Sequence, residues 1–269
     1  MQVPVLRILN GTLTFRLIPT LITLALVPVM IGLGCWQIQR LHWKEDLIAT
    51  MHARMQERAI DVGLSSIAPD NIPNMDFRPG SANGLFQNDH PLYLASTSVG
   101  NGEGGYDILV PLTLDNGSIL LVNRGWMPYA LKDKPDSGSG QYDLYRPAGP
   151  VHVTGILRMP PDKKPGFRPE NEPGKNTWYW LDLPTMAQTA GVKEFLPYVL
   201  EADDAPHDGN YPIGGQTRVD LPNHHFQYAL TWFWLAVILP IIYLVSGWRR
   251  NIAEKPAEPA PESEKEKPE

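Results

Sequence analysis

Cysteine is almost absent from this chain of 269 residues, and its scarcity excludes several kinds of chemistry. The single cysteine, Cys35, permits no disulfide within the chain and no zinc site built from two or four cysteines. Thiol–disulfide exchange would need a thiol from a partner. The sequence also lacks a glycine-rich phosphate loop, a nucleophile elbow and the histidine and carboxylate spacings of common metal sites. We therefore expect a protein that is not an enzyme.

An excess of positive charge is missing as well. The formal net charge is −6 at pH 7, and the tail Asn251–Glu269 supplies half of it, with six Glu against three Lys. The remainder is nearly balanced, so the charge does not indicate a nucleic-acid partner. The tail has almost no apolar side chains to bury, which predicts that it is disordered.

Charged side chains are absent from two long apolar runs. The 23 residues between Arg16 and Arg40 and the 23 residues Phe226–Trp248 are uncharged. As helices they would each extend about 35 Å, enough to cross a hydrocarbon core of about 30 Å. A cleaved signal peptide is the alternative for the first run, but its apolar part is too long for one. We expect two transmembrane helices.

The orientation follows from the basic residues beside these runs. On one side of the expected membrane lie Arg7, Arg16, Arg249, Arg250 and Lys255, and on the other lie Arg40 and Lys44. Basic residues are enriched in the cytoplasm, so we expect both termini to be cytoplasmic and the central domain to be periplasmic. Only 16 residues precede the first run, too few for a long transit peptide, and we expect a bacterial inner (plasma) membrane.

The central region predicts a β-rich domain. Helical periodicity over Leu41–Arg58 continues the first span outward, and Asp115-Asn116-Gly117 is a strong hairpin signal. Pro184 lies just inside the start of a short predicted helix, Leu183–Ala190. The predicted strands are Leu92–Ser96, Tyr106–Leu114, Ile119–Asn123, Val151–Leu157 and Tyr198–Leu200. Successive hairpins favour an α+β membrane protein whose β-rich domain is an open barrel or a sandwich.

The sequence thus divides into five predicted segments. They are a cytoplasmic N-terminus (1–16), transmembrane helix 1 (17–39), a periplasmic β-rich domain (40–225), transmembrane helix 2 (226–248) and a disordered cytoplasmic tail (249–269).

Aromatic and basic residues gather where the two predicted helices leave the bilayer. Trp36, Arg40 and Trp43 share a helix face by their spacing, and so do His225, Tyr228 and Trp232. The first set is either an interfacial anchor or a platform for a flat anionic ligand. His225 is either a hydrated interfacial residue or a haem iron ligand facing Arg40, which suits propionates.

Two further motifs are open to a structural or a functional interpretation. Asn123–Pro128 follows a strand, and its glycine and proline predict a turn there. Phe167–Asn171 and Trp178-Tyr179 combine polar and aromatic residues, which indicates either a partner surface or loop packing.

Short motifs in a fixed order resemble those of the Surfeit locus protein 1 family, and they cover the chain from about Leu33 to Ala236. The matching residues are Gly34, Trp36, Gln37, Arg40, Trp43 and Lys44; Gly84 and Phe86; Val122–Trp126 and Pro128; Pro169–Asn171 and Pro173; Asn176 and Trp178; Asp182-Leu183 and Met186-Ala187; Gly214–Arg218; and Asn223, His225, Tyr228, Thr231 and Trp232.

The resemblance implies a factor that assembles haem–copper terminal oxidases (cytochrome c oxidase) by assisting the insertion of haem a into the catalytic subunit. It also implies that His225 is the haem iron ligand, with Trp36, Arg40, Trp43, Tyr228 and Trp232 around the haem. The implied partners are the oxidase catalytic subunit, the haem a synthesis enzyme and membrane lipid. A membrane scaffold that binds no haem and stabilises an oxidase intermediate is the alternative function.

Overall fold

The computed structural model describes residues 6–8, 11–64, 69–98, 102–132, 145–206, 210–217 and 221–250. The chain splits into two compact units, one made of Met1–Lys44 and Pro222–Glu269, the other of Glu45–Leu221. Residues 251–269 of the tail predicted to be disordered lie outside the described part of the chain, as does Arg218.

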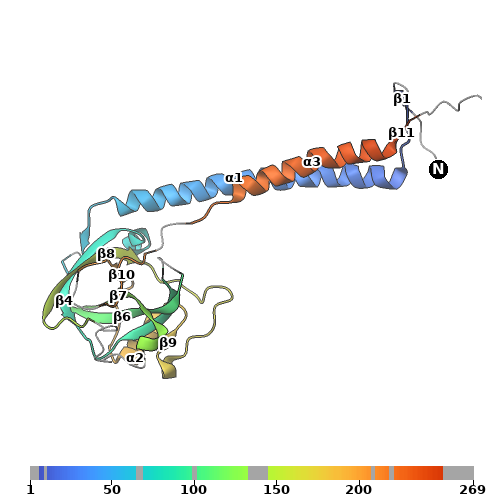
Figure 1. Ribbon diagram of the computed structural model, residues 1–269. Helices are drawn as coiled ribbons and strands as arrows, with labels where there is room; N and C mark the ends of the chain where they lie inside the picture. The colour runs from blue at the N-terminus through green and yellow to red at the C-terminus, as the bar shows by residue number, and fades with distance from the viewer. Residues whose placement is uncertain are drawn as a thin grey trace, which may run out of the picture. The chain divides into compact units, whose positions relative to one another are not determined.

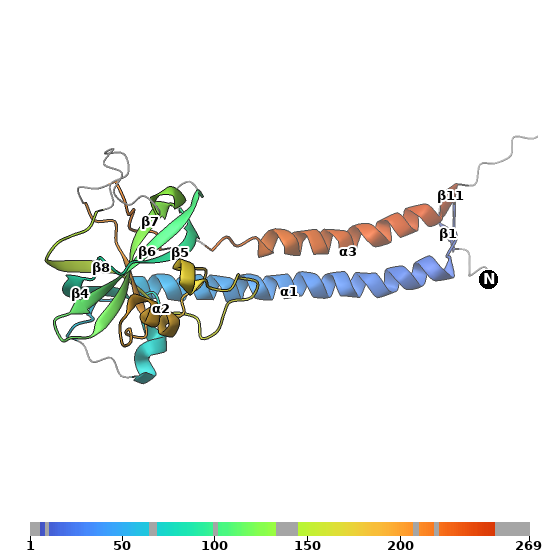
Figure 2. The same ribbon diagram turned by 90° about the horizontal axis from the view of Figure 1, so that it is seen from below.

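The first unit is built on two helices that lie side by side (Figures 1 and 2). Helix α1 runs from Leu17 to Met55 and α3 from His225 to Gly247. Both are long and apolar enough to cross a membrane. The predicted outward continuation of the first helix is confirmed, since α1 is continuous as far as Met55.

The two helices meet along a seam with heptad-like spacing. Some of the buried and half-buried positions on each helix recur at alternating intervals of three and four residues, as in left-handed helix pairs. On α1 they are Thr20, Thr23, Val27, Met30, Gly34, Gln37, Leu41 and Lys44, and on α3 they are His225, Ala229, Trp232, Ala236, Leu239 and Tyr243. Small residues at Gly34, Ala229 and Ala236 are buried, which lets the two backbones approach closely.

Polar contacts join the helix pair at both ends. At one end Thr14 N donates to Gly247 O at 3.0 Å, and β2 (Gly11–Leu13) pairs antiparallel with β11 (Trp248–Arg250). Strand β1 (Leu6–Ile8) completes this small sheet. At the other end Lys44 Nζ donates to Pro222 O at 2.5 Å. The segments before α1 and after α3 therefore lie together.

The second unit is a barrel closed by five strands (Figures 1 and 2). Strands β4, β8, β10, β7 and β6 follow one another around the ring, and β6 pairs back with β4. Only the β10–β7 pairing in this ring is parallel. Strands β3, β5 and β9 extend the sheet beyond the ring. The α+β class is confirmed, and the barrel forms rather than the sandwich.

The elements of the barrel unit have the following bounds: β3 Ile60–Asp61, β4 Pro79–Phe86, β5 Leu92–Thr97, β6 Gly104–Leu114, β7 Ile119–Pro128, β8 Pro150–Arg158, β9 Thr177–Trp178, α2 Leu183–Ala190 and β10 Val199–Ala202, with short 3-10 helices at Pro69–Met75, Tyr129–Leu131 and Pro173–Lys175.

The two largest of three apolar clusters hold the barrel together. Side chains from all five ring strands or their ends fill the interior, among them Ala82, Leu112, Leu120, Leu157 and Leu200. The opposite faces of β5, β6, β7 and β10 carry the second cluster, which α2 covers with Leu183, Met186, Ala187 and Ala190. The predicted strands and the predicted helix Leu183–Ala190 are confirmed.

Strand β4 was not predicted from the sequence, because Pro79, Gly80 and Gly84 interrupt its apolar pattern. The structure explains Gly84, since a Cβ there would lie 2.2 Å from the carbonyl oxygen of Thr113 on β6. A glycine at this position is what allows β4 and β6 to pair and close the barrel.

The turn predicted at Asn123–Pro128 is wrong, because β7 continues through these residues to Pro128. Gly125 adopts φ 122°, and its N–H donates to Asn123 Oδ1 at 3.0 Å. The partner strand β6 shifts register between Asp107 and Leu109, as at a β-bulge. The strand bends here instead of ending, so glycine and proline gave a misleading signal.

We expect Gly84→Ala to destabilise the barrel by about 1–3 kcal/mol, because the added methyl would collide with the β6 backbone. Thermal unfolding of the full chain, followed by near-UV circular dichroism, measures the change. Gly174→Ala is the matched control, since no atom lies within 4 Å of its added Cβ. Equal melting temperatures for the two variants would contradict the closure at Gly84.

We also expect Leu13→Cys and Trp248→Cys to form a disulfide on mild oxidation, because the two residues are paired across β2 and β11. The experiment uses a Cys35→Ser background and detects the bond by its mobility shift on a non-reducing gel. Leu13→Cys with Phe226→Cys, at the far end of α3, is the control pair. A disulfide that formed only in the control pair would refute the antiparallel pairing of β2 with β11.

Candidate functional site

The first part of the candidate site is an exposed aromatic and basic face on α1. Trp36 and Trp43 have 53% and 50% of their surfaces exposed. The guanidinium carbon of Arg40 lies 3.7 Å from the ring centroid of Trp43. Stacking of this kind orients the guanidinium while its N–H groups remain available to an anion.

The second part is a hydrogen bond between the two helices. His225 Nδ1 lies 2.7 Å from the side-chain oxygen of Gln37. An amide oxygen only accepts hydrogen bonds, so the imidazole carries its proton on Nδ1. In the neutral ring Nε2 then keeps its lone pair, which is the atom that binds a metal. Gln37 thus fixes both the orientation and the tautomer of His225.

The structure brings His225 to Gln37, on the seam beside the predicted platform. Gln37 follows Trp36 directly and precedes Arg40 by three residues, so the imidazole is anchored within one turn of both. Trp232 is half-buried on the same seam of α3, whereas Tyr228 is 57% exposed.

His224 and His225 occupy different positions at the start of α3. His224 is the N-cap residue and makes no side-chain capping bond, while His225 is the first helical residue. Only His225 lies on the seam that faces α1. This agrees with the assignment of the functional role to His225, which stays a prediction.

Sequence reasoning gave no role to two residues that build this site. Gln37 holds the imidazole, and Gly34 sets how closely the helices approach, since a Cβ there would lie 2.5 Å from the ring of Phe233. Both residues belong to the motifs that resemble the Surfeit locus protein 1 family, and the alternating spacing of three and four residues from Thr20 to Lys44 was a second signal. Counting it would have placed Gln37 and Gly34 on the seam.

The loop Phe167–Tyr179 is held by internal hydrogen bonds, although Phe167–Glu170 and Pro173–Lys175 are exposed, and a partner surface here stays a prediction. Asn171 Oδ1 accepts from the backbone N–H groups of Tyr179 at 2.8 Å and Trp180 at 3.3 Å. Arg168 Nη1 donates to Tyr179 O at 2.8 Å. Phe167 alone in this loop is a fully exposed large apolar side chain among the residues described here.

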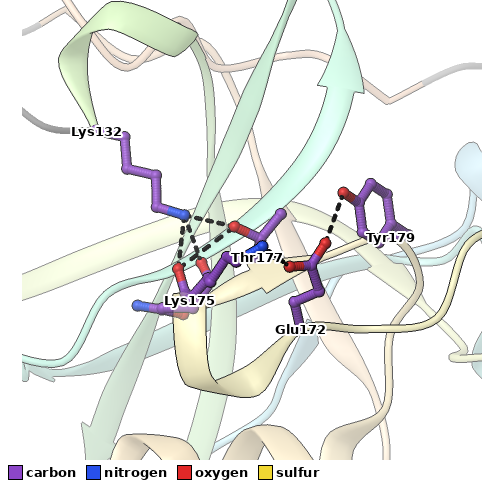
Figure 3. Close-up of polar contacts among 6 residues, drawn as sticks. Lys132, Glu172, Lys175, Thr177 and Tyr179 are labelled. Atoms are coloured by element: carbon purple, nitrogen blue, oxygen red, sulfur yellow. Dashed lines mark hydrogen bonds and ion pairs between the residues drawn. The ribbon is translucent and has the colours of Figure 1, made fainter.

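Lys132 anchors the same loop from the end of the β6–β7 hairpin (Figure 3). Its ammonium donates to the carbonyl oxygens of Lys175 at 2.8 Å and Asn176 at 3.1 Å, and to Thr177 Oγ1 at 2.6 Å. The ammonium also lies 5.2 Å and 5.0 Å from the ring centroids of Tyr93 and Tyr106. Lys132 therefore fixes the backbone of the loop at Lys175–Thr177.

Glu172 and Lys175 form an exposed ion pair at 2.5 Å on the outer side of this loop (Figure 3). The hydrogen bond and charge of Lys175 lower the pKa of Glu172, and Glu172 raises the pKa of Lys175. Both groups consequently stay charged over a wider pH range than usual. Solvent screens an exposed pair, so it contributes little to stability.

Comparison with known proteins identifies the family. The model of the SURF1 family matches residues 24–237, which include most of both long helices and the whole barrel. This chain belongs to the SURF1 family. The Surfeit locus protein 1 of Xenopus tropicalis is 34% identical over 79% of this chain and 70% of its own length. The mouse protein is 33% identical over 85% and 76%, and the human protein 31% over 79% and 72%.

We expect Lys132→Met to lower the stability of this SURF1-family protein by on the order of 2–3 kcal/mol. The substitution removes the ammonium that donates to the loop carbonyl oxygens of Lys175 and Asn176 and to Thr177 Oγ1, while it keeps the length of the side chain. Thermal unfolding measures the loss. Lys175→Met breaks only the exposed ion pair and should change stability by less than about 0.5 kcal/mol. A loss as large for Lys175→Met would contradict the anchoring role of Lys132.

Proposed function

We propose that this protein is an assembly factor for a haem–copper terminal oxidase and that it holds haem a at the membrane edge before its insertion. The observation that carries the proposal is the His225–Gln37 hydrogen bond, which prepares one imidazole Nε2 for iron. Membership of the SURF1 family supports the assembly role.

In this proposal the two apolar helices cross the inner membrane, and the barrel domain is periplasmic. The length and composition of α1 and α3 support the crossing. The β2–β11 pairing supports the placement of both termini on one side, which the basic residues assign to the cytoplasm. Helix α1 is about 58 Å long at 1.5 Å per residue, so its last turns extend beyond the hydrocarbon core.

The residues present fit a haem whose propionates are anionic and whose tail is apolar. His225 supplies one nitrogen ligand, and Arg40 supplies a cation that suits a carboxylate. The exposed rings of Trp36 and Trp43 offer flat apolar surface beside it. When bound, haem a would be cargo, and its redox chemistry belongs to the oxidase that receives it.

A carrier must also release what it holds. A single imidazole ligand binds iron less firmly than two axial ligands would, which favours transfer to the oxidase catalytic subunit. In the residues that the structure describes, no group of three or more His, Cys, Asp or Glu side chains is arranged to hold a metal ion. Membership of the SURF1 family supports an assembly factor rather than a catalyst, and we propose the haem a synthesis enzyme as the donor.

We expect the full chain, co-expressed with the haem a pathway and purified in detergent, to show a Soret absorption band. His225→Ala should lose it or shift it, because the iron ligand is gone. Gln37→Leu should weaken haem retention about 10-fold to 100-fold, because the imidazole loses the partner that orients it.

His224→Ala is the matched control and should retain the wild-type spectrum, since His224 lies off the seam. A wild-type spectrum for His225→Ala would refute the ligand assignment. A wild-type protein without haem, combined with low oxidase activity in a gene deletion, would replace the carrier with the scaffold alternative.

A further inference from the structure

One mouth of the barrel contains a cavity of about 260 Å³ that the proposed haem site does not use. Four ring strands contribute side chains to the wall of this cavity, namely Phe86 from β4, Arg124 from β7, Val153 from β8 and Ala202 from β10. These side chains continue the rows of inward-facing residues that fill the barrel interior. Each is an even number of residues from an interior side chain of its strand, so all four face inward. Barrel mouths are common ligand sites.

Arg124 is an unusual cation for such a position. Its guanidinium carbon lies 5.0 Å from the ring centroid of Phe86 and 5.7 Å from that of Tyr145. Its side chain is half-buried, and loss of solvent lowers its pKa to about 10. Within the described part of the chain no carboxylate is paired with it.

Two other half-buried arginines of the domain have carboxylate partners, whereas a third, Arg54, donates to the backbone carbonyl oxygen of Asp76 at 3.3 Å. Arg78 binds Glu57 at 2.8 Å. Arg158 stacks on Phe77 as Arg124 stacks on its aromatic neighbours, yet Arg158 also binds Asp76 at 3.1 Å. Buried cations are normally paired with an anion in this way. Arg124 differs from Arg78 and Arg158, because in the described part of the chain no carboxylate lies opposite its guanidinium.

The carboxylate among the residues that line the cavity is already engaged. Asp203 Oδ2 accepts from Thr154 Oγ1 at 2.7 Å, and Asp203 N donates to Thr154 O at 2.9 Å. Its charge nevertheless lies in the wall and selects against a highly charged ligand. The remaining wall combines apolar side chains, among them Phe86, Val151 and Pro212, with His152, whose Nδ1 lies 2.7 Å from Asn83 Oδ1. One guanidinium in apolar surroundings suits a single negative charge on an apolar group.

The backbone around the mouth is held in place before any ligand arrives. Trp126 and Ile213 exchange two backbone hydrogen bonds of 2.9 Å, and Gly215 N donates to Ala202 O at 2.9 Å. Gly125 makes this approach possible, because a Cβ there would lie 2.1 Å from Ile213 O. Tyr145 N donates to Tyr211 O at 2.8 Å, which fixes the other wall. A prearranged pocket reduces the ordering cost of binding.

From these observations we infer that the barrel mouth binds a carboxylate carried on an apolar stem, with Arg124 as its ion-pair partner. The guanidinium is planar and binds a carboxylate through two parallel hydrogen bonds. Its position over two aromatic rings leaves the N–H groups for these bonds available. The volume of the cavity accommodates one such group but not a whole porphyrin. The inference is independent of haem binding by the helix pair.

The test uses the full chain in lipid nanodiscs and 4-phenylbutyrate as the probe, with binding measured by calorimetry and saturation-transfer NMR. Its neutral analogue, 4-phenylbutan-1-ol, has the same stem without the charge. We expect the acid to bind at least about tenfold more tightly than the alcohol. Arg124→Gln should remove that difference, and Arg146→Gln, which removes a neighbouring exposed cation, should retain it.

The stability of Arg124→Gln separates a binding role from a structural one. Below pH 10 the unliganded protein carries the unfavourable buried charge, because burial lowers the pKa of Arg124 in the folded state. Its removal should leave the melting temperature unchanged or raise it. Equal binding of the acid and the alcohol by the wild-type chain would overturn the inference. Unchanged binding of the acid by Arg124→Gln would overturn it as well.

A second titration identifies the source of the carboxylate. The peptide Ala-Ala-Phe with a free C-terminus is compared with 4-phenylbutyrate and with its own C-terminal amide. Tighter binding of the free peptide assigns the site to the end of a polypeptide chain, and tighter binding of the small acid assigns it to a free monocarboxylate. Binding of the amide as tightly as the free peptide overturns the inference.

Discussion

The close contact of two apolar helices is the constraint on which the proposed site depends. Gly34 has no side chain to separate α1 from the Phe233 ring on α3, and the seam then continues to the pair Gln37 and His225. In an apolar environment helices gain little from burying apolar surface, so close packing and interhelical hydrogen bonds decide how they associate. The same contact that joins the helices therefore also orients the imidazole.

Much of the architecture could be predicted from local pattern. The uncharged runs, the alternating strands, the Asp115-Asn116-Gly117 hairpin and the capped helix α2 all depend on neighbouring residues in sequence. Pro184 lies in the first turn of α2, as the sequence indicates, and Asp182 caps the helix through Thr185. These features need no knowledge of distant contacts.

The parts that sequence reasoning missed depend on contacts between distant segments. Strand β4 contains glycine because β6 approaches its backbone, and β7 continues past Gly125 because the Ile213 segment pairs with Trp126. In the sequence, a glycine that is needed because two backbones approach closely cannot be told from a glycine in a turn. The role of Gln37 was hidden for a similar reason, since its partner lies 188 positions away in the chain.

The place of β10 in the barrel has a consequence for how the domain is made. Strand β10 lies between β7 and β8, although it comes after both in the chain, and it joins β7 in parallel. A nascent chain that ends before Val199 leaves both neighbours with unpaired backbone edges, which are prone to aggregate. The barrel cannot close during synthesis until this late strand has emerged, so its closure depends on contacts between segments distant in the chain.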